Sequence, residues 1–326
     1  MPHRGGWLTR WTPAAAIALL AACATARAED GLAAWIEQLD DDRYACRERA
    51  VRYVASYGAE AVGPLLNAVT DQRPELVRRA VDVLVWLGHS GDAPARAAAQ
   101  QGLEQLARRP QPLVARSAIW GRARLGRIQQ RRLIRTIESN GGRVFANNTW
   151  GDEAQVSYVI LGKAWQGDDG ILAELHWLPA LEALGIQGNQ FTDASVQRLQ
   201  AMPNLRLVQL YGTNVSDVGE ALLKSRMPQA RIDRRAGALL GIQGSRNSQG
   251  CQVEYVRPNT AASRAALVPG DVITRFDGKP VDTFEALTAL IAKRRPGTRA
   301  TLEIMREGQT FEVEVVMGQI DVEEFP

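Results

Sequence analysis

Residues 237–242 have the sequence Gly-Ala-Leu-Leu-Gly-Ile and stand immediately before a stretch of extended character. Glycine lets a backbone turn tightly and direct successive N–H groups toward one point, which is how a loop becomes a binding site for an anion. The two glycines, with apolar residues between them, therefore predict an anion-binding loop that leads into a β-strand.

The residues after this loop predict strands separated by turns. Alternating side chains indicate strands at 251–256 and 272–276, and Pro-Gly-Asp at 269–271 indicates a turn between them. Asp-Gly at 277–278 is a second turn signal. This part of the chain is therefore expected to form an antiparallel sheet.

A single helix is expected next. Apolar residues recur at helical spacing between residues 283 and 294, with Asp282 or Thr283 as the N-cap and Pro296-Gly297 as the stop. The apolar positions are Phe284, Leu287, Leu290 and Ile291. The chain then predicts a closing hairpin, with its strands and turn at 301–305, 311–316 and 307–308.

Three separated motifs, in this order, resemble the PDZ domain of bacterial HtrA-type proteins. They are Gly-Ala-Leu-Leu-Gly-Ile at 237–242, Ala-Ala-Ser-Arg-Ala-Ala-Leu-Val-Pro-Gly-Asp-Val-Ile at 261–273, and Phe-Asp-Gly-Lys-Pro-Val at 276–281. The resemblance implies an α+β PDZ-like domain at 236–320, followed by a short tail at 321–326.

The same resemblance implies a peptide site. Backbone N–H groups of Leu240, Gly241 and Ile242 would hold a terminal carboxylate, the next strand would pair with the peptide, and the helix would wall the side-chain pocket. The implied peptide-binding residues are Leu239, Leu240, Gly241, Ile242, Gln243, Gly244, Phe284, Leu287, Leu290 and Ile291.

Residues 29–130 are rich in Ala, Leu and Arg and contain an internal repeat. Its apolar positions Leu39, Ala50, Val51 and Val54 recur as Val69, Ala80, Val81 and Leu84, and a looser copy follows at 112–126. A helical pair cannot bury its apolar face alone, so such units stack. The pattern resembles short HEAT-like repeats and predicts an α-helical solenoid.

Residues 131–235 contain a second repeat system. Leu-x-x-Leu-x-Ile-x-Gly at 181–188 recurs as Leu-x-x-Val-x-Leu-x-Gly at 205–212, and a weaker copy begins at Val156. The spacing resembles leucine-rich repeats and predicts a short α/β solenoid. The resemblance implies a concave face that includes Gln187, Arg206, Gln209 and Tyr211. Such a face binds proteins; the alternative is a structural bridge to the PDZ-like domain.

The N-terminus predicts export. Arginines precede an apolar run at 14–22 that is too short to span a bilayer, and Ala-Arg-Ala at 26–28 predicts signal cleavage before Glu29. Leu-Ala-Ala-Cys at 20–23 leaves a second possibility, a lipoprotein anchored through Cys23. The first alternative predicts a secreted or periplasmic protein, and the second a membrane-anchored one.

Charge and cysteine content exclude several classes of function. Removal of residues 1–28 takes away three arginines and no acid, which leaves basic and acidic residues balanced at 36 each. A neutral chain offers no electrostatic basis for nucleic-acid binding. Cys46 and Cys251 would remain in different domains, without the spacing of a metal site, and we expect both to be buried free thiols.

No catalytic constellation can be identified in the sequence. The chain has three histidines, no Gly-x-Ser-x-Gly motif, and no phosphate loop, dinucleotide fingerprint or zinc spacing. An HtrA-type protease would carry a trypsin-like domain before its PDZ domain, whereas repeats fill that space here. We therefore expect a non-enzymatic protein without cofactor or metal.

These patterns together predict a multidomain interaction protein of the bacterial envelope. The leading hypothesis is that the PDZ-like domain binds extended peptides or protein C-termini. The alternatives are a lipid-anchored assembly scaffold, in which the repeats bind the partner and the PDZ-like domain is structural, and an adaptor for a separate protease.

Overall fold

The computed structural model describes residues 31–147, 155–199 and 202–322. The predicted signal peptide, with cleavage before Glu29 or lipidation at Cys23, lies outside these residues. Contacts divide the chain into two units, residues 1–131 and 132–326. The domain limits drawn from the sequence stay predictions.

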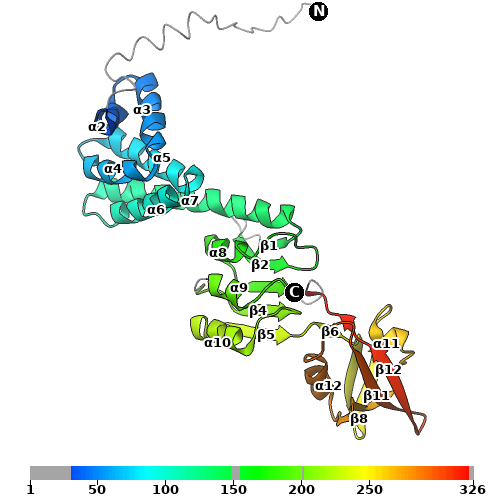
Figure 1. The fold of residues 1–326 in the computed structure, drawn as a ribbon. Coiled ribbons are helices and arrows are strands. Elements are labelled where there is room, and N and C mark those ends of the chain that lie inside the picture. Colours follow the sequence, from blue (N-terminus) through cyan, green and yellow to red (C-terminus); the bar gives the residue numbers. More distant parts are fainter. Residues whose placement is uncertain (1–30, 148–154, 200–201, 323–326) are drawn as a thin grey trace, which may run out of the picture. The chain divides into compact units, whose positions relative to one another are not determined.

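The first unit is helical (Figure 1). A proline lies in the first turn of both α5 and α6, where its missing N–H costs nothing, and the Asp92 side chain caps α6 by accepting from Ala95 N at 2.8 Å. The repeated apolar positions Leu39, Val54 and Leu84 are fully buried in one core. The helices are α2 (Leu32–Glu37), η1 (Gln38–Asp40), α3 (Tyr44–Ser56), η2 (Gly58–Ala61), α4 (Val62–Ala68), α5 (Pro74–Ser90), α6 (Ala93–Ala107) and the start of α7 (Pro112–Ser139).

The second unit begins with a five-stranded sheet, here called the repeat sheet. Its order is β1-β2-β3-β4-β5, antiparallel between β1 and β2 and parallel from β2 to β5. Figure 1 shows α8, α9 and α10 on one side of it. The elements are β1 (Arg143–Asn147), β2 (Gln155–Leu161), α8 (Ile171–Glu174), η3 (Leu175–Trp177), β3 (Ala183–Gln187), α9 (Asp193–Arg198), β4 (Leu207–Tyr211), α10 (Asp217–Arg226) and β5 (Arg231–Arg235).

Alternation along these strands separates two faces. Leu184, Ile186, Val208 and Leu210 are buried on the helix side with apolar residues of α8 to α10. Ser216 begins α10 by accepting from Val218 N and Gly219 N. Assignment of these units to the leucine-rich family, and of the first unit to the HEAT family, stays a prediction.

The remaining chain forms a β-rich region with two short helices. Its main sheet has the order β12-β11-β9-β8-β7, with β10 beside β9, and a separate pair joins β13 to β6. The elements are β6 (Ala238–Leu239), β7 (Ile242–Asn247), β8 (Gly250–Val256), α11 (Ala261–Arg264), β9 (Val272–Phe276), β10 (Lys279–Pro280), α12 (Phe284–Ile291), β11 (Arg299–Arg306), β12 (Gln309–Val316) and β13 (Gly318–Gln319).

These bounds confirm the strands and turns predicted from the sequence and shorten the predicted helix. Thr283 is the N-cap of α12, with its hydroxyl accepting from Ala286 N at 3.1 Å. The helix ends at Ile291 rather than at Arg294. The N–H groups of Lys293 and Arg294 donate to the carbonyls of Leu290 and Ile291, three residues back, so the chain leaves the α-helix in a turn.

Candidate functional site

Strand β7 is an edge strand of the main sheet and has β8 on one side only. Ile242 pairs with Val256 while Arg257 N donates to Gly241 O, so Ile242 and Val256 form a pair without mutual hydrogen bonds. The N–H and C=O of Ile242 therefore point away from β8, toward the free edge. An edge of this kind can accept a further strand.

Two carbonyl groups of the predicted anion-binding loop accept hydrogen bonds from other parts of the domain. Leu240 O accepts from Ala262 N at 2.8 Å, and Gly241 O accepts from Arg257 N at 2.9 Å. Within the described ranges, the N–H groups of Leu240 and Gly241 donate no hydrogen bond. The loop thus leaves donors available, as an anion nest requires.

Glycine is required at position 241. Its φ is +89°, and a Cβ placed there would lie 2.3 Å from Cβ of Thr260. The Thr260 hydroxyl donates to Arg257 O at 2.7 Å, which fixes this side chain beneath the loop. Both the backbone conformation and the available space exclude a side chain.

Helix α12 faces β7 with the apolar residues expected from its spacing. Leu287 is fully buried, whereas Phe284, Leu290 and Ile291 are half-buried against the core, as is Ile242. The ring of Phe284 lies close to Gly244 of β7. The structure therefore brings the predicted strand, loop and helix residues together, with Gln243 exposed on the strand.

Leu239 does not share the surroundings of β7 and α12. It pairs with Gly318 of β13, and its half-buried side chain packs against an apolar cluster on the repeat sheet. That cluster contains Tyr158, Ile160, Tyr211, Ile320 and Val322. Leu239 therefore connects the loop to the repeat sheet.

The predicted concave face is not open in this structure. Gln187, Gln209 and Tyr211 are 2%, 6% and 1% exposed. Residues 320–322 of the same chain contact Gln187 and the cluster that contains Tyr211, and Gln209 is hydrogen-bonded between Tyr158 and Tyr211. Arg206 precedes β4 and is exposed. The expectation of a free concave surface is therefore wrong for the first three residues. The physical reason is that Ile320 and Val322 bury apolar area there.

The covered face also contains a chain of buried hydrogen bonds. Tyr158 OH donates to Gln209 Oε1 at 2.8 Å, Gln209 Nε2 donates to Tyr211 OH at 3.2 Å, and Tyr211 OH donates to Asp233 Oδ2 at 2.9 Å. Burial raises the pKa of Tyr158 to about 12, and burial together with Asp233 raises the pKa of Tyr211. Both phenols are therefore neutral near pH 7.

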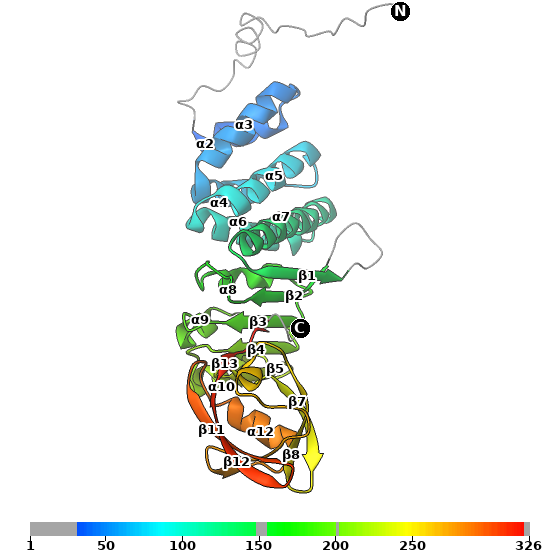
Figure 2. The same ribbon diagram turned by 90° about the vertical axis from the view of Figure 1, so that its right-hand side faces the viewer.

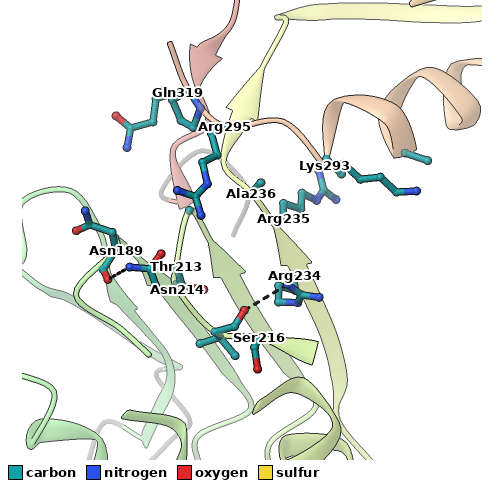
Figure 3. Close-up of a pocket in the computed structure, with 16 residues that line it drawn as sticks. Asn189, Thr213, Asn214, Ser216, Arg234, Arg235, Ala236, Lys293, Arg295 and Gln319 are labelled. Carbon is teal, nitrogen blue, oxygen red and sulfur yellow. Dashed lines mark hydrogen bonds between the residues drawn. The ribbon is translucent and has the colours of Figure 1, made fainter. Parts of the chain in front are cut away.

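A polar hollow of about 1080 Å³ is the larger of two described cavities (Figure 3). Its cationic side chains are Arg234, Arg235, Lys293 and Arg295. Arg234 and Arg235 already pair with carboxylates: Arg234 with Asp217 and Glu220, and Arg235 with Asp233. Figure 3 shows Arg295 extending toward Asn189 and Thr213. The sequence contained no motif that predicted this hollow.

A smaller hollow of about 290 Å³ lies in the first unit. It is lined by Trp120, which is 67% exposed, together with Val81, Val85 and the Arg124–Asp82 ion pair at 2.7 Å. Exposed tryptophan is common at protein contacts.

The cysteine prediction needs one correction. Cys251 is a buried free thiol, as expected, but Cys46 is disulfide-bonded. The prediction assumed that signal removal leaves two cysteines in different domains and therefore no partner for Cys46. Within the described ranges, no group of three or more His, Cys, Asp or Glu residues is placed to hold a metal ion. The same ranges contain no helix with the length and apolar character to cross a membrane.

Comparison with known proteins identifies one part of the chain. Residues 238–317 match the family model of the PDZ domain. The periplasmic pH-dependent serine endoprotease DegQ of Escherichia coli (strain K12) is 35% identical over 91 residues, which is 24% of this chain and 20% of DegQ. A probable periplasmic DegP-like serine endoprotease of Chlamydia trachomatis is 40% identical over 75 residues, 23% of this chain and 15% of that protein. The chain thus spans a fifth or less of these relatives' length.

Solved structures match over a similar extent. The HtrA-type protease AlgW with decapeptide is 20% identical, with a TM-score of 0.27, over 32% of this chain and 35% of that chain. The HtrA3 PDZ domain bound to a phage-derived ligand is 20% identical, with a TM-score of 0.24, over 27% of this chain and 91% of that chain. The C-terminal part of this chain contains a PDZ domain of the HtrA type.

Proposed function

We propose that this protein binds extended peptides along β7, with a terminal carboxylate at the loop formed by Leu240, Gly241 and Ile242. The observation that carries this proposal is the combination of the free edge of β7 with unused N–H groups in the loop. A peptide strand added to such an edge gains main-chain hydrogen bonds, and half-buried apolar residues of α12 receive its side chains.

The test is a screen of C-terminal pentapeptides against the full chain by fluorescence anisotropy. Each binding peptide is compared with its C-terminal amide, which removes the negative charge and one oxygen. We expect the free acid to bind at least about tenfold more tightly, since charge-assisted hydrogen bonds contribute roughly 1.5–3 kcal/mol. Equal affinity of acid and amide would contradict carboxylate recognition, and a screen without binders would contradict the proposal as a whole.

A matched pair of variants tests strand addition itself. Val253 N donates to Asp271 O and Val253 O accepts from Gly270 N, so these groups do not bond to Gly244, the partner of Val253 on β7. Hydrogen-bonding direction alternates along an antiparallel pair, so the N–H and C=O groups of Gly244 and Arg246 point to the free edge. Arg246→Pro removes one outward N–H, whereas Arg246→Ala removes the same exposed side chain and keeps the N–H. We expect only the proline variant to weaken pentapeptide binding, by roughly fivefold.

We further propose that the protein is non-enzymatic and acts in the bacterial envelope. The curated relatives are named as proteases and match only 22–24% of this chain, and several are named as periplasmic. A casein-hydrolysis assay tests the first statement, and fractionation of cells producing the full precursor tests the second. Hydrolysis that follows the purified chain through successive columns would overturn the first.

The alternative scaffold function places the partner on the repeats. It requires a free repeat surface, and the covered state of Gln187, Gln209 and Tyr211 weighs against the concave face as that surface. An adaptor for a separate protease stays compatible with peptide binding at β7.

A further inference from the structure

The C-terminal segment crosses from the PDZ domain to the repeat sheet and is buried there. Ile320 and Val322 are 2% and 0% exposed and pack with Tyr158, Ile160 and Tyr211. Figure 2 shows this red segment beside β3 and β4. It is the terminal extension of the PDZ domain, yet its side chains belong to a cluster built by the repeats.

Gln187 recognises the backbone of this segment. Its Nε2 donates to Ile320 O at 2.7 Å, and its Oε1 accepts from Val322 N at 3.1 Å. One side-chain amide thereby satisfies the two main-chain groups on either side of Asp321, much as a neighbouring strand would. Gln187 is buried, so loss of the segment would leave its amide without these partners.

Gly185 provides the space for Val322. A Cβ at position 185 would lie 2.7 Å from Val322 Cγ2 and 3.1 Å from Tyr158 OH. At the intervening position, Asp321 points to a cation: Lys163 Nζ lies 3.1 Å from Asp321 Oδ2. The surface therefore fits an extended segment with apolar, acidic and apolar residues in succession.

The same segment also holds the strand that precedes the peptide-binding loop. β13 pairs with β6 through Gly318 and Leu239, and Ile320 N donates to Gly237 O at 2.8 Å. Leu239 packs against the cluster that receives Ile320 and Val322. Position 240, where the loop begins, is therefore one residue from a strand fixed by the tail.

We propose that the face of the repeat sheet formed by Tyr158, Gly185, Gln187 and Tyr211 is a binding site for an apolar-acidic-apolar segment, filled in cis by Ile320-Asp321-Val322. While the tail is docked, this face is closed to other proteins and β6 is held in place. The proposal concerns the repeat sheet and does not depend on peptide binding at β7.

The test uses full-length chains and hydrogen exchange. In the wild type, the amides of Ile320 and Val322 are expected to exchange at least about a hundredfold more slowly than in an unstructured peptide. Val322→Asp places a charge in the apolar cluster and is expected to remove this protection and to accelerate exchange of the hydrogen-bonded amides of Ala238 and Leu239. Gln319→Asp adds the same charge to an exposed residue of the same tail and is expected to leave both unchanged.

A second measurement asks whether the emptied face binds in trans. A labelled, amidated peptide corresponding to residues 317–322 is titrated against each full-length chain. We expect the Val322→Asp protein to bind it at least tenfold more tightly than the wild type or Gln319→Asp, in which the site is occupied. If Val322→Asp fails to fold, wild-type exchange still decides. Fast exchange of Ile320 and Val322 in the wild type, or equal trans binding by all three folded chains, overturns the proposal.

Discussion

The free edge of β7 and the face of the repeat sheet are both able to receive an extended segment, but they do so with different groups. The edge offers backbone donors and acceptors, which every residue carries, so it can pair with many sequences. The face offers shaped side chains, namely Gln187, Tyr158 and Tyr211, around the gap at Gly185. The first surface is general and open, whereas the second is selective and already filled by the chain itself.

This difference changes which part of the chain offers an unoccupied surface. From their repeat pattern, the repeats were the natural place to seek a protein partner. Their concave face instead receives the tail of the PDZ domain, whereas β7 keeps a free edge in the part of the chain that the structure describes. A predicted binding surface can thus be occupied by a segment of the same chain, because that segment is present at a far higher effective concentration than a separate partner.

The largest expected effect is on the free energy of unfolding of the PDZ domain, which contains the open edge of β7. Asp271 is fully buried and accepts from Arg306 Nε at 2.7 Å, Arg306 Nη2 at 2.8 Å and Val268 N at 2.9 Å. Asp271→Ala leaves Val268 N and the Arg306 guanidinium without this acceptor. We expect it to destabilise the PDZ domain by about 2–3 kcal/mol in urea unfolding followed by circular dichroism. Asp271→Asn, which keeps shape and one acceptor, serves as the milder control.

The same carboxylate predicts an acid dependence. Burial raises the pKa of Asp271, but hydrogen bonds from Arg306 and Val268 N and the Arg306 charge outweigh it, so the pKa lies below its ordinary value. A lowered pKa gives stability that is complete above the unfolded value near 4 and is lost as the pH falls through the folded value. The wild type should therefore lose more stability than Asp271→Asn below about pH 4. Parallel acid profiles would contradict this assignment.

A smaller effect is expected on the covered face. Tyr211→Phe removes the hydroxyl that donates to Asp233 and accepts from Gln209, and we expect a loss of about 1–2 kcal/mol in the free energy of unfolding. Tyr255→Phe is the control, since Tyr255 is 47% exposed on β8. Equal stability of the two variants would show that the hydrogen-bond chain does not support this face.

The last prediction concerns the rate at which the buried Cys251 thiol of the wild-type protein is alkylated, which reports on opening of the sheet at β7. Cys251 is buried under β7, close to Gly244, and burial, with Glu285 and Glu254, raises the pKa of its thiol to about 11. At pH 8 we expect iodoacetamide to label it at least a hundredfold more slowly than in the urea-unfolded chain. Mass spectrometry of the peptide containing Cys251 measures this rate. Rapid native labelling would show that β7 opens readily.

Local patterns in the sequence predicted most of the PDZ region. Alternating side chains marked β8 and β9, turn residues marked their limits, and the apolar spacing from Phe284 to Ile291 marked α12. These features are local because side-chain periodicity and turn chemistry depend on neighbouring residues. The end of α12 was misplaced by three residues, since Lys293 N and Arg294 N donate three residues back in a turn, which apolar spacing does not distinguish from a helix.

The tail shows where local reasoning ends. Ile320-Asp321-Val322 alternates as a short strand would, and this was the one available signal that residues 321–326 are not simply a tail. The sequence of those residues does not predict that they contact Gln187 and Gly185. The hydrogen bonds join positions more than 130 residues apart.

By itself, the sequence determined most elements of the PDZ domain, the glycine turn at position 241 and the buried rows of the repeat sheet, because periodicity and glycine conformation are properties of short segments. Only the tertiary structure decided that β7 stands at a free edge and that the opposite face of the repeat sheet is occupied. Edges and faces are defined by which segments pack together, and that depends on the free energy of the whole folded chain.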